Sequence, residues 1–188
     1  MNVLNKEVSS MILETKRLRL RNWRVGEEAV LKTFLGSDEV MYAYEGGFDD
    51  LKIANWLSWN LKLYQEKGYG LWAIERKSDG KIIGECGLTD QTIDGKTYVE
   101  IGYHLIASEW HKGYMMEATQ AVKNYAFEIL RVAEVVSIIR DTNLASMNVA
   151  IRNGMTVTQR IVKQYSGIEM PHYIFKVKKR TACQKTED

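Results

Sequence analysis

The sequence predicts an α+β fold with a mixed, mostly antiparallel central sheet of about seven strands, flanked by about four helices. Arginine and leucine alternate over residues 17–21, as they do in a strand with one buried face. Asp-Gly pairs at 79–80 and 94–95 are typical of turns between antiparallel strands. After residue 113, helical and strand-like segments alternate, which predicts a crossover and a sheet that is not purely antiparallel.

The first third of the chain contains one strand and two helices in this interpretation. The strand at 17–21 is followed by a short helix at 26–36, which carries glutamates in its first turn. A longer helix begins at Asp49 and ends before Gly68, with apolar residues at helical spacing.

The middle of the chain is an antiparallel meander. Its strands are expected at 69–76, 81–89 and 98–106, joined by the two Asp-Gly turns. In the third strand the side chains that share an apolar face are those of Val99, Ile101, Tyr103 and Leu105.

The last part of the chain predicts two helices among three strands. In order, these are a helix at 113–130, a strand at 132–140, a helix at 143–153, and strands at 155–162 and 172–177. We expect residues 11–178 to form a single domain, and residues 1–10 and 179–188 to be flexible termini.

Composition narrows the class of protein. The chain has 188 residues, 45% of them hydrophobic and 27% charged, which is enough for one globular domain or two small ones. A net charge of +2, with basic residues spread along the chain, does not indicate nucleic acid. No apolar run could span a membrane, and Cys86 and Cys183 lack metal-ligand spacing. We therefore expect a cytoplasmic protein without a metal or a membrane partner.

The segment from Trp110 to Ala118 predicts an anion site. It leads from a strand into a helix whose first amides have no helical partner, and the helix dipole favours negative charge there. Lys112 adds a cation, and Gly113 lets the backbone approach a phosphate closely. Taken alone, the segment is equally compatible with an ordinary helix start.

A second segment makes the pattern specific. Residues 143–146 read Asn-Leu-Ala-Ser and open a helix that ends with Arg-Asn-Gly-Met at 152–155. Together with the turn at 110–118, this order resembles the GNAT superfamily of acetyltransferases. The opening at 13–21 and the Glu-Ile-Gly-Tyr strand at 100–103 resemble the branch of ribosomal-protein alanine/serine N-terminal acetyltransferases. The likeness covers residues 13 to about 178.

Three positions depart from the branch pattern. His111 replaces the usual glycine, Met115 replaces a small residue, and residues 150–152 stand where a Glu-Lys pair is common. Met115 is compatible with phosphate binding if its side chain points into the core while its amide faces the ligand. These departures motivate the alternative of a catalytically weak CoA-binding or regulatory module.

The resemblance implies a GNAT fold and an acetyltransferase. Acetyl-CoA would be the cosubstrate, and a primary amine would attack it directly in a ternary complex. The acceptor would be a protein N-terminus, ribosomal proteins included, or a small-molecule amine. The protein would be a monomer or a homodimer. RNA binding is a further reading, motivated by Arg17, Arg19, Arg21 and the cluster at 178–180, although nucleic acid is not the expected partner.

The resemblance also implies roles for individual residues. The expected cofactor-binding residues are Leu105, Ile106, His111, Lys112, Gly113, Tyr114, Met115, Met116, Asn143, Ser146 and Arg152. Backbone amides of Leu105 and Ile106 would hold the acetyl carbonyl, and the Ser146 hydroxyl would protonate the leaving thiolate. Helix capping is the alternative for Asn143, capping or packing for Ser146, and a solvated helix face for Arg152.

The base and the acceptor site are less defined by sequence. Glu100 is the candidate general base, and a solvated or paired side chain is its alternative. By resemblance, the acceptor site would be walled by Tyr42, Tyr44, Trp56 and Trp59, and core packing is the alternative for the tryptophans. His104 and His172 have no visible partner, which indicates packing or surface roles.

Overall fold

A computed structural model describes residues 11–165 and 167–179. Its elements are β1 (Met11–Glu14), β2 (Leu18–Arg21), α1 (Glu28–Leu35), α2 (Asp50–Lys67), β3 (Leu71–Arg76), β4 (Ile82–Ile93), β5 (Lys96–Leu105), a 3-10 turn (Ala107–Glu109), α3 (Tyr114–Glu128), β6 (Glu134–Arg140), α4 (Leu144–Arg152), β7 (Thr156–Tyr165) and β8 (Ile168–Lys178). The four predicted helices and the seven predicted strands are confirmed, and β1 is an additional strand.

The strands form one sheet in the order β1-β2-β3-β4-β5-β6-β8-β7. Every neighbouring pair is antiparallel except β5 and β6, which are parallel because the crossover through α3 returns the chain in the same direction. The α+β class with a mixed, mostly antiparallel sheet is therefore confirmed.

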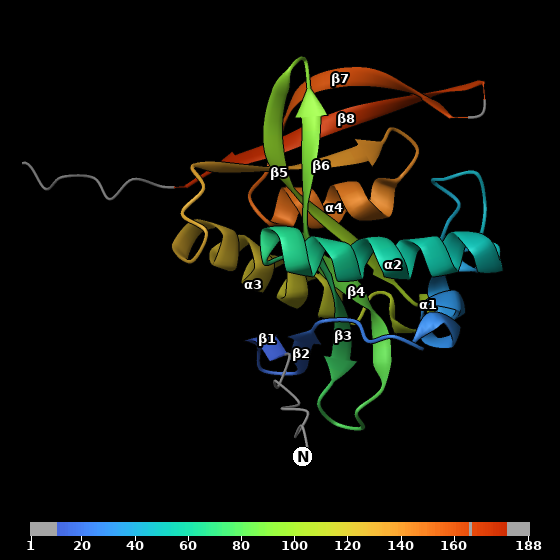
Figure 1. Cartoon of the computed structure of the whole chain (residues 1–188). Coiled ribbons are helices and arrows are strands. Elements are labelled where there is room, and N and C mark those ends of the chain that lie inside the picture. Colours follow the sequence, from blue (N-terminus) through green and yellow to red (C-terminus); the bar gives the residue numbers. More distant parts are fainter. Residues whose placement is uncertain (1–10, 166, 180–188) are drawn as a thin grey trace, which may run out of the picture.

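Helices cover both faces of the sheet (Figure 1). Side chains from α3 and α4, such as Ala118 and Ala150, pack with Ile101 and Leu105 of β5 in the larger core cluster. Side chains from α1 and α2, such as Leu31 and Leu57, form a second cluster against the other face. Successive residues of β5 thus face different helix pairs, because side chains alternate along a strand.

The β4–β5 hairpin sets the register of the centre of the sheet. Asp94 and Gly95 both have positive φ, 49° and 76°, which is the conformation of a two-residue type I′ turn. The turn pairs Ile93 with Lys96, and the ladder then places Glu85 opposite His104. The predicted Asp-Gly turn is confirmed, and it determines which polar side chains of the two strands become neighbours.

β5 and β6 separate soon after they meet. Their ladder contains only two pairs, Val99 with Val135 and Glu100 with Val136. β6 continues alongside β8 as far as Arg140, so a gap opens between the later halves of β5 and β6. A side-chain hydroxyl enters this gap, where Ser137 Oγ donates to the Ile101 carbonyl at 2.8 Å.

The ends of the chain lie mostly outside the described residues. This applies to the predicted flexible termini at 1–10 and 180–188, and to Cys183. Lys179, which we expected in the flexible tail, is held in place, because its N–H donates to the Ala133 carbonyl at 2.8 Å and its Nζ to the Phe127 carbonyl at 2.8 Å. Among the described helices, none is long and apolar enough to cross a membrane.

The arginines of the first predicted strand are paired with acids. Arg19 contacts Glu75 at 3.4 Å, and Arg21 contacts Glu27 at 2.7 Å. Arg17 contacts the carboxylate of Glu117 at 2.6 Å. Each of these three cations therefore has an anionic partner.

Candidate active site

The turn before α3 presents its backbone amides at a helix start. Gly113 is the N-cap of α3 with φ of 78°, a left-handed conformation that favours glycine. The first hydrogen bond of the helix runs from the Glu117 N–H to the Gly113 carbonyl. The amides of Tyr114, Met115 and Met116 precede that ladder, and such amides form an anion site together with the helix dipole.

The two unusual residues of the turn behave differently. The Met115 side chain is 7% exposed and belongs to the core cluster that includes Ala118. This is the arrangement in which Met115 leaves room for a ligand at the amides. His111 has φ of 60°, where a side chain is strained, which explains why the branch pattern has glycine there.

Lys112 lies at the turn, but its charge is shared with an acid. Its Nζ contacts Glu109 Oε2 at 3.0 Å, and Arg76 Nη1 contacts the same oxygen at 2.8 Å. Hydrogen bonds from Lys112 and then Arg76 hold the pKa of Glu109 below its ordinary value, against the effect of burial. The predicted cation is therefore present in a cluster with a second cation, Arg76, and two carboxylates, since Arg76 also pairs with Asp79 at 2.6 Å.

The amides predicted to hold the acetyl carbonyl point in opposite directions. The Ile106 N–H donates to the Ile83 carbonyl at 2.9 Å, so the expectation that it is open to a ligand is wrong. Because successive amides of a strand alternate in direction, the Leu105 N–H points toward the gap beside β6. The Leu105 carbonyl accepts a hydrogen bond from Trp110 Nε1 at 2.8 Å, which ties the turn before α3 to the end of β5.

Glu100 lies where β5 and β6 separate. Its Oε1 accepts a hydrogen bond from the Ile138 N–H at 2.9 Å, and its Oε2 accepts one from the Thr89 hydroxyl at 3.3 Å. Burial raises the pKa of the Glu100 carboxyl, and the bond from Ile138 opposes that shift. Glu100 thus accepts a hydrogen bond from the Ile138 amide, which faces the gap where β5 no longer pairs with β6. The role of Glu100 as a base stays a prediction.

The start of α4 faces the same gap. Asn143 caps the helix, because its Oδ1 accepts from the Ser146 N–H at 3.0 Å, and it also accepts from the Tyr42 hydroxyl at 2.8 Å. The Tyr103 hydroxyl donates to the Ser146 carbonyl at 2.9 Å. Ser146 is half-buried in the first turn of α4, and this bond ties its backbone to β5.

Arg152 lies at the other end of α4 and is exposed. The adjacent Asn153 is held against α3, where its Nδ2 donates to the Thr119 carbonyl at 3.3 Å and its carbonyl accepts from Lys123 Nζ at 2.6 Å. These contacts place Arg152 more than one turn along α3 from the turn that precedes this helix. The contact of Arg152 with a phosphate stays a prediction.

A buried polar network joins three elements on the α1–α2 side of the sheet. His104 Nδ1 lies 3.0 Å from Glu85 Oε1, and His104 Nε2 lies 3.1 Å from the Tyr44 hydroxyl. Glu85 also accepts hydrogen bonds from Trp56 Nε1 and Trp23 Nε1, each at 3.0 Å. The sequence showed no partner for His104, and the structure gives it two in a buried position, while Glu85 was not recognised from the sequence.

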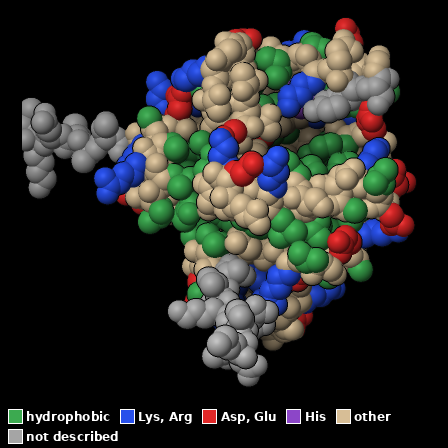
Figure 2. Space-filling view, viewed as in Figure 1, with side chains coloured by type: hydrophobic (Ala, Val, Ile, Leu, Met, Phe, Trp, Pro, Cys, Tyr) green, Lys and Arg blue, Asp and Glu red, His purple; other side chains and the backbone are tan. Residues whose placement is uncertain are grey.

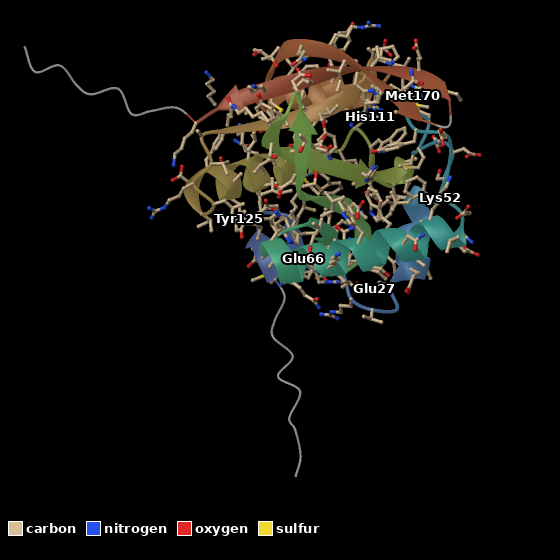
Figure 3. All side chains as sticks on the ribbon, turned by 45° about the horizontal axis from the view of Figure 1, so that its top comes forward. Glu27, Lys52, Glu66, His111, Tyr125 and Met170 are labelled. Atoms are coloured by element: carbon tan, nitrogen blue, oxygen red, sulfur yellow. The ribbon has the colours of Figure 1, made fainter. Side chains whose placement is uncertain are left out.

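An open pocket of about 300 Å³ lies beside this network on α2. It is lined by Phe48, Lys52, Asn55, Trp56 and Trp59. The pocket occupies the N-terminal half of α2, the end that carries Lys52 in Figure 3, whereas Glu66 marks the other end. Figure 2 shows hydrophobic side chains gathered on the face that includes α2.

The structure brings most of the predicted site residues together. The Trp56 ring lies 5.9 Å from the His104 ring, and Tyr44 contacts His104 directly. Tyr42, a predicted acceptor-site residue, contacts Asn143, a predicted cofactor residue. One predicted acceptor-site residue and one predicted cofactor residue are therefore in direct contact.

Comparisons with known proteins agree with this geometry. Residues 17–156 match the family described as the acetyltransferase (GNAT) domain. The uncharacterized protein YkkB of Bacillus subtilis is 36% identical over 154 residues, which span 80% of this chain and 88% of the relative. An acetyltransferase (GNAT family) from Bacillus anthracis has the same fold, with a TM-score of 0.75 at 18% identity over 89% of this chain and 98% of that chain.

A second similar structure contains a bound ligand. RimL, a ribosomal alpha-N-protein acetyltransferase in complex with coenzyme A, has a TM-score of 0.72 at 20% identity, over 89% of this chain and 97% of that chain.

Proposed function

This chain belongs to the GNAT acetyltransferase family, and we propose that it transfers the acetyl group of acetyl-CoA to a primary amine by direct attack in a ternary complex. The observation that carries this proposal is the gap between β5 and β6, which has a helix start with unpaired amides at one end and the capped start of α4 at its side. One substrate can enter the gap from each face of the sheet.

The residues of the phosphate turn fit acetyl-CoA. The amides of residues 114–116 would receive the pyrophosphate, and the buried Met115 side chain leaves them accessible. The Leu105 N–H points into the gap, where it can orient a carbonyl. When bound, acetyl-CoA supplies an acetyl group activated as a thioester.

Two side chains have proposed roles in proton transfer. Ser146 would donate its hydroxyl proton to the leaving sulfur, a role supported by its place in the first turn of α4. Glu100 is the sequence-based candidate base, but both its oxygens accept hydrogen bonds within the sheet, so a base on the acceptor side of the sheet is the alternative.

The pocket on α2 supports an acceptor whose amine is attached to an apolar group. Three of its five lining residues are aromatic, and one is the cation Lys52, which disfavours a polycationic acceptor. An α-amine with a pKa near 8 is neutral in about a tenth of molecules at pH 7, whereas a lysine amine is neutral about once in 2,500. We therefore propose a protein N-terminus, such as that of a ribosomal protein, or a small apolar amine.

The test is acetylation of a panel of acceptors. The protein is incubated with acetyl-CoA and peptides with free N-termini, polyamines or aminoglycosides, and both released thiol and acceptor mass are measured. We expect thiol release together with an added acetyl mass on a peptide or an apolar amine. Tight binding of acetyl-CoA without thiol release for any acceptor would instead favour the CoA-binding module.

A further inference from the structure

We propose that Tyr44, His104 and Glu85 form a proton relay that removes the proton from the acceptor amine. Tyr44 meets the amine and is the catalytic residue, while His104 and Glu85 act through it. The inference rests on the proposed function and assigns the buried network a task in it.

The relay runs from the surface to the interior. Tyr44 is 41% exposed, His104 is 9% exposed, and Glu85 is fully buried. The contacts along this line are 3.1 Å from the Tyr44 hydroxyl to Nε2 and 3.0 Å from Nδ1 to Oε1. An acceptor can therefore reach the first member while water is kept from the last.

The partners of Glu85 determine where the imidazole carries its proton. Indole N–H groups only donate, so Trp23 and Trp56 make both oxygens of Glu85 acceptors. The remaining contact then requires a proton on His104 Nδ1, which leaves the lone pair of Nε2 directed at the Tyr44 hydroxyl. A carboxylate in this position also stabilises the imidazolium, as in the hydrolase triads.

The place of the network favours a functional role over a structural one. Burying a carboxylate costs free energy, and apolar residues of similar size would serve packing equally well. Glu85 and His104 instead lie beside an open pocket, where an acid–imidazole pair can act on a bound acceptor. Trp56 connects the two, since its ring lines the pocket and its indole N–H donates to Glu85.

The relay also lies opposite the proposed acid. His104 and its neighbour Tyr103 point to opposite faces of β5, and Tyr103 contacts the Ser146 carbonyl. Proton removal and thiolate protonation would thus occur on the two sides of the same strand.

The proton transfer balances as follows. The ammonium of the acceptor gives one proton to the Tyr44 oxygen, while the hydroxyl hydrogen of Tyr44 moves to His104 Nε2. The products are a neutral amine and an imidazolium paired with Glu85. The C–N bond then forms as the C–S bond breaks. The Ser146 hydroxyl gives its proton to the leaving sulfur, and the second amine proton passes to the Ser146 oxygen. The imidazolium returns its proton to solvent through Tyr44.

Two substitutions test the relay with the acceptor that the panel identifies. His104→Asn keeps a hydrogen-bond donor near the Nδ1 position but cannot take a proton, and Tyr44→Phe removes only the hydroxyl. We expect kcat to fall about a hundredfold in the first and at least about tenfold in the second, with the KM for acetyl-CoA within about threefold. As a control, Tyr69→Phe removes a phenol bond to Asp90 far from the pocket, and kcat stays within about twofold.

A second measurement does not depend on turnover. The chain has three histidines, so the 15N resonances of the unliganded protein can be assigned with His104→Asn as reference. We expect His104 to carry its proton on Nδ1, and Glu85→Gln to abolish that preference. A proton on Nε2 alone would overturn the relay. If the wild type turns over and the kcat of His104→Asn is within threefold of it, the relay is overturned and the proposed function stands. If the wild type does not turn over, both are overturned.

Discussion

Arg17 and Glu117 join two segments that lie a hundred residues apart in the sequence. Arg17 Nε donates to Glu117 Oε2 at 2.6 Å, and the Arg17 N–H donates to Glu117 Oε1 at 2.7 Å. The Thr15 hydroxyl donates to Oε1 as well, and Arg17 Nη1 donates to the Lys112 carbonyl at 2.9 Å. The segment that connects β1 to β2 therefore holds the turn before α3 in place.

Replacing Glu117 should destabilise the protein. Glu117→Ala leaves the Arg17 N–H and the Thr15 hydroxyl without their acceptor, which should cost about 2 kcal/mol of unfolding free energy. Urea denaturation measures the change. The control Glu66→Ala removes an exposed pair with Lys62 on α2 and should cost under about 0.5 kcal/mol. Equal losses in the two variants would contradict the role of Glu117.

The contribution of Glu117 should depend on pH. Burial opposes its ionisation, but hydrogen bonds from Thr15 and Arg17 outweigh burial and lower its pKa below the ordinary 4.5. The stabilisation is therefore complete above pH 4.5 and is lost as the pH falls through the lowered value. The difference in unfolding free energy between wild type and Glu117→Gln should shrink between pH 5 and pH 3, and a constant difference would refute this account.

Glu100 should show the opposite dependence. Burial raises its pKa above 4.5, so the folded state favours the protonated form and loses stability as the pH rises through the raised value. Glu100→Gln cannot ionise, so the stability of this variant relative to wild type should increase from pH 4 to pH 7. Denaturation at several pH values measures this, and the reverse trend would show that the carboxylate is stabilised in place.

Removing the strain at His111 should stabilise the turn. Glycine adopts a φ of 60° without the penalty of a side chain, so His111→Gly should gain about 1 kcal/mol and keep the affinity for acetyl-CoA within threefold. Arg131, with φ of 56° at the end of α3, provides a matched control, because Arg131→Gly should give a similar gain away from the turn. Calorimetry measures stability and affinity. A large loss of affinity in His111→Gly alone would assign the imidazole to ligand binding.

Two residues at the start of α4 can be substituted to distinguish helix capping from catalysis. Asn143→Ala removes the cap and should cost about 1 kcal/mol, whereas Asn143→Ser should retain most of that. Ser146→Ala keeps the cap and should lower kcat about a hundredfold at unchanged stability. Turnover within threefold of wild type in Ser146→Ala would leave Ser146 as a packing residue.

Local patterns predicted the main elements of the fold. Alternation located β2, and the Asp-Gly pair located the β4–β5 turn. Strand β1 was missed because Met11–Glu14 shows no alternation and becomes a strand by pairing with β2. The segment thus depends on a neighbour rather than on its own sequence.

The site was predicted where it depends on the backbone and missed where it depends on tertiary contacts. The phosphate turn follows from a helix start, which is a local feature. The contact of Tyr44 with His104 joins a loop to a strand sixty residues away, and no local pattern encodes it. The pairing of Glu85 with His104 was within reach, because nine residues counted outward from each side of the Asp94-Gly95 turn arrive at this pair.

The Asp94-Gly95 turn is consequently under a constraint that its position does not reveal. It lies about 30 Å from Glu85 and His104, the length of nine residues in a strand. An insertion of one residue there would shift the register, and every side chain of one strand would move to the other face. Evolution can vary the identity of these two residues within the limits of positive φ, but a change in the length of the turn would separate Glu85 from His104.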